Sequence, residues 1–271
     1  MKRFLRDPIA TAALILAAAI MAAALLAPWL APGDPTDNDL AQAMAPPGDT
    51  LLLGADDQGR DMVTRLLYGL RLTLLIGATS VLLGGTIGAT LGLLAGYYRR
   101  LDGLVMRCMD ILLSFPAILF GLAIAAIFGP GIPAVILALS VATIPLTARI
   151  VRASAGVEMA RDYIEAARAT GMTDRRLIWR HLAPNCASAV VVFATLRFGQ
   201  VILLGAALSF LGLGAQPPTA ELGSMASQGR TFLFFAPHIA VAPCAAIFLV
   251  VLVFNILGDA LRDALDPRIT L

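Results

Sequence analysis

The stretch Asp162–Asn185, DYIEAARATGMTDRRLIWRHLAPN, is the most polar long passage of a chain that is otherwise strongly apolar. It contains two short helical patterns on either side of Gly171 and carries several arginines. Glycine readily adopts the left-handed conformation that ends a helix. Helices this short are marginal in water when isolated, so each one must pack on something. The stretch therefore predicts two short helices that lie against other protein or against the membrane.

The first of these helices carries a small, flat surface. Asp162 is expected to cap it, with Glu165 reaching back as in a capping box. Three alanines follow, and alanine has the highest helix propensity: Ala166, Ala167 and Ala169. The pattern lacks the large apolar face that a helix lying on lipid needs. We therefore favour a groove on another protein as its partner, with the lipid surface as the alternative.

The second helix is expected to start after Thr173 and to end at Pro184. Its apolar side chains are expected to lie on one face. Its leucines and isoleucine lie on one side and its arginines mostly on the others. We expect this helix to lie at the membrane surface.

The composition of the whole chain indicates a membrane protein. The 271 residues are 59% hydrophobic and only 14% charged, against about 25% charged in an ordinary soluble domain. The apolar residues form runs near the length of about 20 residues that crosses a bilayer as a helix. These runs are Ile9–Leu30, Leu72–Tyr97, Val105–Phe128, Ile132–Arg149, Ala187–Leu211 and Ala236–Leu257. The predicted fold class is all-α, a polytopic membrane protein with six transmembrane helices.

The basic residues are distributed unevenly along this layout. Fifteen of the lysines and arginines lie in the N-terminal tail, the 98–110 and 149–186 loops and the C-terminal tail, against four in residues 31–71 and 214–235. The positive-inside rule then places both termini and the polar stretch in the cytoplasm. We divide the chain into a tail and retained first span (1–30), an acidic, proline-rich outer loop (31–71) and a core of five spans (72–271). This core contains the polar loop 158–185.

Two features inside the spans concern helix shape and packing. Small residues recur at every fourth position of the second run: Gly84, Gly88, Gly92 and Gly96. Such a stripe lets two helices approach closely. Pro116 lacks a backbone donor and should kink the third span, as Pro145 should kink the fourth. Kinked helices suit a protein that opens a path, and they also occur in rigid bundles.

Charged residues in unusual places are further candidates. Arg197 lies deep in the fifth span, where a charge costs about 2.5–3.5 kcal/mol on insertion scales. It must line a pathway or fix a helix interface. Four charges also crowd the outer sequence DDQGRD: Asp56, Asp57, Arg60 and Asp61. They could contact a docking partner or form a gate, although we slightly favour a turn whose ion pairs satisfy one another.

Several function classes are disfavoured by what the sequence lacks. The chain has a single lysine, Lys2, which cannot serve a phosphate-binding loop, so we expect no ATP site here. Three distant cysteines and two histidines make a structural zinc site improbable, and no metal, cofactor or nucleic acid is expected. A membrane enzyme would need paired acids or a metal motif, and HExxH is absent. A secondary transporter would usually show inverted repeats, and no clear repeat is present.

The polar loop resembles the EAA loop of membrane subunits of ATP-binding-cassette (ABC) importers. Glu165, Ala166, Ala167 and Gly171 match its spacing, whereas His181 and the Ala183-Pro184 pair depart from its usual apolar residue and Leu-Pro ending. Other stretches are similar to the dipeptide, oligopeptide and nickel permeases. They are LLGADDQGRDMVTRLLYGLRLTLLIG (52–77), SFLGLGAQPPTAELGSM (209–225) and FNILGDALRDALDPR (254–268).

This resemblance implies a type I ABC importer fold in a bacterial inner membrane. It implies that the first short helix docks into an ATPase subunit through a set of coupling residues: Tyr163, Glu165, Ala166, Ala167, Ala169, Thr170 and Gly171. The implied partners are a second, non-identical permease subunit, two ATPase subunits that bind ATP and magnesium, an external substrate-binding protein and membrane lipid. The implied cargo is a dipeptide or oligopeptide. The alternative cargoes are nickel, a metal chelate or a glutathione-type peptide. A secondary transporter is the alternative from a different functional class.

Overall fold

The structure is a computed structural model that describes residues 7–265, and it is almost wholly helical. Five helical segments among these residues are long and apolar enough to cross a membrane, and a bent helix pair raises the number to six. The long helices are α1 (Pro8–Leu25), α3 (Met62–Tyr97), α6 (Ile132–Met159), α9 (Ala183–Phe210) and α11 (His238–Leu265). This architecture confirms the predicted all-α fold class. The basic residues Lys2, Arg3, Arg6 and Arg268 lie outside the described residues.

The bent pair shows that the expected kink in the third span was too mild. The span is two helices, α4 (Arg99–Ser114) and α5 (Ala117–Phe128), which meet at 87°. A proline disfavours the helical conformation of the residue before it, and Phe115 is extended with φ −97° and ψ 135°. Pro145 behaves differently, because α6 continues on both sides of it.

Helix α3 begins earlier than the sequence indicated. Met62–Arg71 was expected to belong to the outer loop, but it forms the first turns of α3. Asp61 explains this start, because its carboxylate accepts hydrogen bonds from the Thr64 backbone N–H (2.7 Å) and hydroxyl (2.7 Å). At 1.5 Å per residue α3 is about 54 Å long, longer than the hydrocarbon core of about 30 Å. Its first turns therefore extend into the outer loop.

The glycine stripe of α3 packs against α6. A Cβ atom added to Gly84, Gly88 or Gly92 would lie 2.5 Å from a carbonyl oxygen of α6, and these oxygens belong to Ser140, Ile144 and Ala148. At Gly96 the added atom would lie 2.6 Å from the Ala155 Cβ atom. The four-residue spacing on α3 thus meets a four-residue spacing on α6, as in small-residue contacts between membrane helices. The two helices approach along most of their common length.

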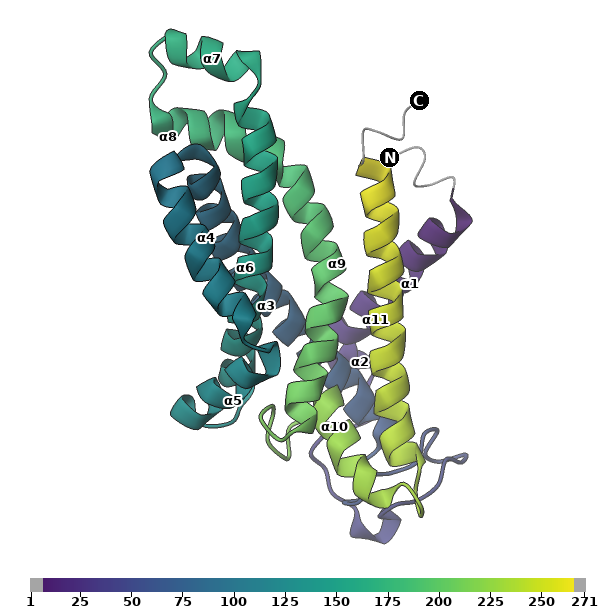
Figure 1. The fold of residues 1–271 in the computed structure, drawn as a ribbon. Helices are drawn as coiled ribbons and strands as arrows, with labels where there is room; N and C mark the ends of the chain where they lie inside the picture. The colour runs from purple at the N-terminus through teal and green to yellow at the C-terminus, as the bar shows by residue number, and fades with distance from the viewer. Residues whose placement is uncertain (1–6, 266–271) are drawn as a thin grey trace.

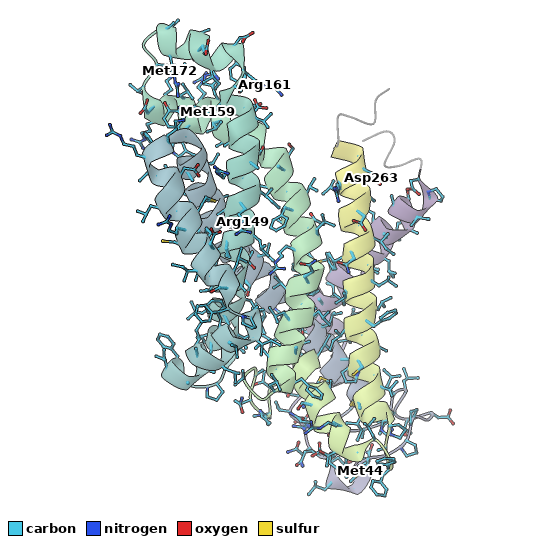
Figure 2. All side chains as sticks on the ribbon, viewed as in Figure 1. Met44, Arg149, Met159, Arg161, Met172 and Asp263 are labelled. Atoms are coloured by element: carbon cyan, nitrogen blue, oxygen red, sulfur yellow. The ribbon has the colours of Figure 1, made fainter. Side chains whose placement is uncertain are left out.

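The ends of the molecule differ in structure (Figure 1). At one end lie α7 (Asp162–Ala169), α8 (Asp174–Leu177) and a π-helical turn (Ile178–Leu182), and here α1 begins and α11 ends. At the other end lie the 31–61 loop, the short α2 (Ala27–Leu30) and α10 (Leu222–Gly229). Figure 2 marks the two ends with Arg161 and Met172 on one side and Met44 on the other. The two sequence regions singled out for function are therefore at opposite ends.

Candidate functional site

Helix α7 presents an exposed face to its surroundings and a buried face to its own chain. It begins at Asp162 without a side-chain cap, so the expected capping role of Asp162 was wrong; this carboxylate lies in the first turn instead, where the helix dipole favours a negative charge. Ile164 and Ala167 are buried, whereas Glu165 and Ala166 are exposed, as are Ala169 and Thr170. Ala167 was expected to contact a partner, but it packs inward at a helical position next to Ile164.

A hydrophobic core holds α7 and α8 against the spans. Ile164 and Ala167 of α7 pack with Leu177, Ile178 and Leu182 from the second helix and the π-turn. Residues of three spans complete this core: Leu93 and Tyr97 of α3, Val151 and Ala155 of α6, and Cys186 of α9. The second helix therefore uses its apolar face for this core rather than for the membrane surface. Any displacement of α7 must carry the ends of these helices with it.

The turn after α7 has the geometry that the sequence predicted for Gly171. Its φ is +78°, in the left-handed region that favours glycine. The Gly171 N–H donates to the Arg168 carbonyl (2.9 Å), and the Met172 N–H donates to the Ala167 carbonyl (3.2 Å). These hydrogen bonds satisfy the last carbonyl groups of α7, and the turn directs the chain back towards α8.

Tyr163 connects three helices rather than facing outward alone. Its hydroxyl donates to the Glu158 carboxylate of α6 (2.9 Å) and accepts from the Asn185 amide of α9 (2.9 Å). Burial first, and then the hydrogen bond to Glu158, raises the pKa of the Tyr163 phenol. The neutral phenol is thus the form that holds α7 to the ends of α6 and α9.

Asp174 is a second tie that sequence reasoning missed. Its carboxylate accepts hydrogen bonds from the hydroxyls of Tyr97 (2.7 Å) and Tyr98 (3.3 Å) at the end of α3. Arg168 of α7 also stacks over the Tyr97 ring at 5.3 Å. The paired tyrosines where a span meets an arginine-rich loop were the available signal. No local pattern connects Asp174 to these tyrosines, because they lie 76 and 77 residues away along the chain.

Replacing Asp174 by alanine is expected to loosen the loop without unfolding the spans. Two tyrosine hydroxyls lose a charged acceptor, and hydrogen bonds to charged groups contribute about 1.5–3 kcal/mol. Trypsin should then cleave the purified protein in the arginine-rich 161–180 segment several-fold faster than the wild type. Tyr98→Phe, which removes only the longer bond, should change the rate little. Equal cleavage of Asp174→Ala and wild type would show that this tie does not hold the loop.

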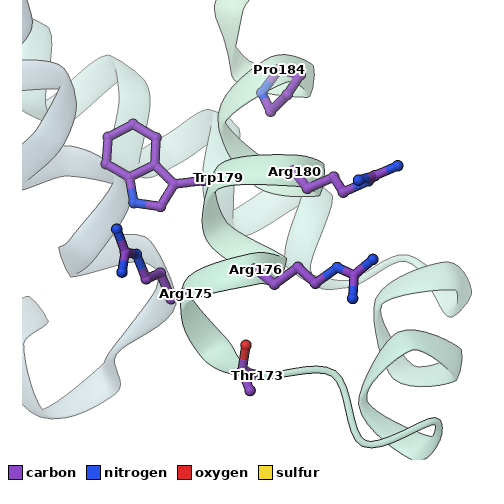
Figure 3. Close-up of a pocket in the computed structure, with 6 residues that line it drawn as sticks. All are labelled: Thr173, Arg175, Arg176, Trp179, Arg180 and Pro184. Carbon is purple, nitrogen blue, oxygen red and sulfur yellow. The ribbon is translucent and has the colours of Figure 1, made fainter.

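An open, basic hollow lies beside the second helix (Figure 3). It has a volume of about 730 Å³ and is lined by Thr173, Arg175, Arg176, Trp179, Arg180 and Pro184. Thr173 occupies the N-cap position of α8 without a capping side-chain bond. Pro184 does not end the helical run as expected. It lies at the start of α9, where the preceding π-helical turn continues directly into the span.

At the opposite end, the DDQGRD turn is closed on itself. The Asp56 carboxylate accepts from the backbone N–H groups of Gln58 (2.9 Å) and Arg60 (3.0 Å) and from the Arg60 guanidinium (2.7 Å). Asp57 lies 3.8 Å from the same guanidinium, and Asp61 caps α3. Asp56 and Arg60 are buried, and their charges face each other. The turn is the self-satisfied arrangement that the sequence slightly favoured.

Two buried residues of this outer end escaped sequence reasoning. Arg65 is 1% exposed, pairs with Asp56 (3.1 Å) and donates to the carbonyls of Pro35 and Pro218. Glu221 accepts from the Thr73 hydroxyl of α3 (2.9 Å) and caps α10 through two backbone N–H groups. Arg65 belongs to α3 and fastens both the 31–61 and the 212–221 segments to this helix, and Glu221 also fastens the second of them. Arg65 reaches Pro218 and Glu221 reaches Thr73 across more than 100 residues, and no local pattern shows these two contacts.

Comparisons with known proteins place this arrangement in a family. Residues 88–271 match the family described as binding-protein-dependent transport system inner membrane component, and residues 1–47 match the N-terminal TM domain of oligopeptide transport permease C. A glutathione transport system permease protein, GsiD, of Pectobacterium atrosepticum is 45% identical and covers 99% of this chain and 90% of its own length. The GsiD protein of an Escherichia coli strain is 44% identical, covering 99% and 89%.

Solved structures share the fold at lower identity. The MetNI methionine ABC transporter in an inward-facing conformation gives a TM-score of 0.62 at 23% identity, covering 76% of this chain and 98% of the other. An amino acid ABC transporter solved with histidines gives 0.58 at 21% identity, covering 75% and 95%. The structure combines a broken span, a glycine-packed helix pair and a short helix held at the end of the bundle. The chain belongs to the family of binding-protein-dependent transport system inner membrane components, the permease subunits of ABC importers.

Proposed function

We propose that this chain is a translocation subunit of an importer of short peptides and that α7 couples it to separate ATPase subunits. The observation that carries the proposal is the two-sided character of α7. Its outer face is small, with Ala166 and Ala169 beside Glu165, and is exposed. Its inner face is fixed to three spans by a buried core. A partner that grips the outer face would therefore move the spans.

The rest of the assembly follows from this role. We propose that α7, α8 and both termini face the cytoplasm, as the arginines around the basic hollow favour. ATP and magnesium would be bound by two ATPase chains, so this subunit would itself be non-catalytic. A second, non-identical permease would complete the pathway, and a binding protein would deliver cargo to the 31–61 end.

For the cargo, dipeptides and oligopeptides are our first proposal, supported by the match to an oligopeptide permease domain. Glutathione is the second candidate, because relatives at 44–45% identity are named for its transport. Nickel and metal chelates are the remaining candidate cargoes. A secondary transporter is not retained, since the family works with a binding protein.

Replacing Ala166 by tryptophan is expected to abolish coupling. The side chain at this position is exposed and makes no contribution to the buried core, so the chain should still fold and insert. A tryptophan would prevent close approach of a partner to the flat face of α7. We expect ATP-driven uptake by the co-expressed complex to fall more than about tenfold, a loss of more than about 1.4 kcal/mol of coupling.

Ala12→Trp is the matched control, because Ala12 is exposed and belongs to α1, a helix that Figure 1 shows on the other side of the molecule from α7. It should leave uptake near the wild-type rate. Uptake would be measured in vesicles with labelled dipeptides, longer peptides, glutathione and nickel complexes, with co-purification of the ATPase as a second readout. If Ala166→Trp transports and retains the ATPase like Ala12→Trp, α7 is not the docking helix.

A further inference from the structure

Arg197 lies at the midpoint of α9, a helix of 28 residues. At 1.5 Å per residue it is about 20 Å from either end of the helix. Among the residues that the structure describes, its guanidinium has neutral partners only. One terminal nitrogen donates to the Gln200 side-chain oxygen (2.6 Å), and the other donates to the Ala142 carbonyl of α6 (3.4 Å). Its Nε atom is buried with no hydrogen-bond partner.

No carboxylate in the described part of the chain pairs with this cation. The ion pairs found in residues 7–265 lie at the outer turn and near the α4, α6 and α7 ends, and none includes Arg197. A buried donor without a partner costs about 1–3 kcal/mol. An unpaired charge facing lipid costs more, so ionisable groups inside membranes mark substrate paths or find partners. Within residues 7–265, Arg197 therefore has no charged partner.

The surroundings of Arg197 determine which anion fits. Gln200 lies one helical turn away and is exposed, and its side-chain oxygen accepts a hydrogen bond from the guanidinium. The N–H groups of the same amide are therefore next to the guanidinium. Guanidinium groups bind carboxylates through parallel N–H donors, and a neighbouring amide adds a neutral donor. A phosphate would also accept these bonds, but peptides carry a carboxylate at their C-terminus. The site thus matches the one anion that the proposed cargo always has.

We propose that Arg197 and Gln200 form a mid-membrane contact for the C-terminal carboxylate of the cargo during translocation. The inference rests on the proposed peptide cargo. Arg197 would supply the charge and one or two donors. Gln200 would orient the guanidinium through the bond already present and offer its own N–H groups.

Accessibility to charged thiol reagents tests the site directly. Cys108 and Cys244 would be replaced by serine and Cys186 by alanine, and a single cysteine would be introduced as Leu203→Cys. Leu203 is 56% exposed and lies one turn beyond Gln200, so Arg197 and Gln200 stay intact. The complete complex, without binding protein, would be treated with a sulfonate-bearing and an ammonium-bearing methanethiosulfonate.

We expect the anionic reagent to react several-fold faster than the cationic one and Arg197→Gln to remove that preference. Millimolar dialanine should slow the reaction, whereas dialanine amide, which lacks the carboxylate, should not. Arg197→Lys should keep part of the preference, because the charge remains. A sealed helix interface would leave the cysteine unreactive to both reagents. Equal protection by dialanine and its amide, or an unchanged preference in Arg197→Gln, would also overturn the proposal.

Uptake separates this inference from the proposed function. In the wild-type complex, ATP-driven uptake of dialanine or glutathione tests the peptide importer itself. If that uptake occurs, Arg197→Gln should lower it about tenfold or more, as expected for a lost charge-assisted bond, with the complex still assembled. Normal uptake by Arg197→Gln would remove the carboxylate contact and leave the importer standing. Absent wild-type uptake would remove the peptide cargo, while the thiol experiment would still report whether an anion site exists.

Discussion

Leucine in place of Gly88 is expected to separate α3 from α6 and to prevent the protein from accumulating in a folded form. An added Cβ atom alone would lie 2.5 Å from the Ile144 carbonyl oxygen and 2.8 Å from the Thr147 Cβ atom. The obstacles are backbone and a β-branched residue, and neither can rotate away. Overpacking by single methylene groups already costs about 1–3 kcal/mol. A leucine at the centre of the longest helix contact should cost more.

Gly85→Leu is the matched control on the same helix. Its added Cβ would meet nothing within 4 Å, so the larger side chain has open space. Size-exclusion chromatography of the detergent-solubilised chains should give a single folded peak for Gly85→Leu and aggregated or absent protein for Gly88→Leu. A folded Gly88→Leu protein with an unchanged melting temperature would mean that α3 and α6 are not held at this distance.

Replacing Asp56 by alanine is expected to destabilise the outer end almost as severely. The carboxylate pairs with Arg60 and Arg65, whose side chains are 6% and 1% exposed, and it also closes the turn through two backbone N–H groups. Removing one partner of a buried ion pair costs about 3–5 kcal/mol, because the remaining charges stay buried. That is a large share of a typical net stability of about 5–15 kcal/mol.

Asp57→Ala supplies the comparison, since Asp57 lies 3.8 Å from Arg60 and its side chain is 27% exposed. Partly exposed pairs contribute about 0–1 kcal/mol, so this variant should melt close to the wild type. Thermal unfolding followed by the reactivity of the buried Cys186 thiol would rank the variants. Similar melting temperatures for Asp56→Ala and Asp57→Ala would show that the buried triad of charges carries no particular weight.

Gly88 lies within α3, and Asp56 is connected to the start of the same helix through Arg65. Helix α3 is joined to the outer turn through Arg65 and to the α8 loop through Tyr97, and it is packed on α6 between them. A displacement of α7 would thus reach the outer end through a continuous helix pair rather than through flexible loops. This continuity supports the proposed coupling of ATPase movement to opening of the path.

Local chemistry determined much of this protein from the sequence alone. The apolar runs specified an all-helical membrane fold, because a bilayer leaves the backbone no other partner than itself. The four-residue glycine spacing predicted a helix contact, since small residues let two helices approach closely. Gly171 specified the turn after α7 for a similar reason, and the EAARATG stretch specified the family.

Contacts between distant segments could be decided only by the tertiary structure. Ala167 turned inward because Ile164, one helical turn away, lies on the same face of α7 and both pack on the spans. The local effect of Pro116 disfavours a helical Phe115 but does not by itself set the angle of 87° between α4 and α5. The tyrosines that bind Asp174 and the threonine that binds Glu221 lie far along the chain. Sequence periodicity records which face of a helix is apolar, whereas the choice of a partner for a buried charge is made by the packing of whole helices.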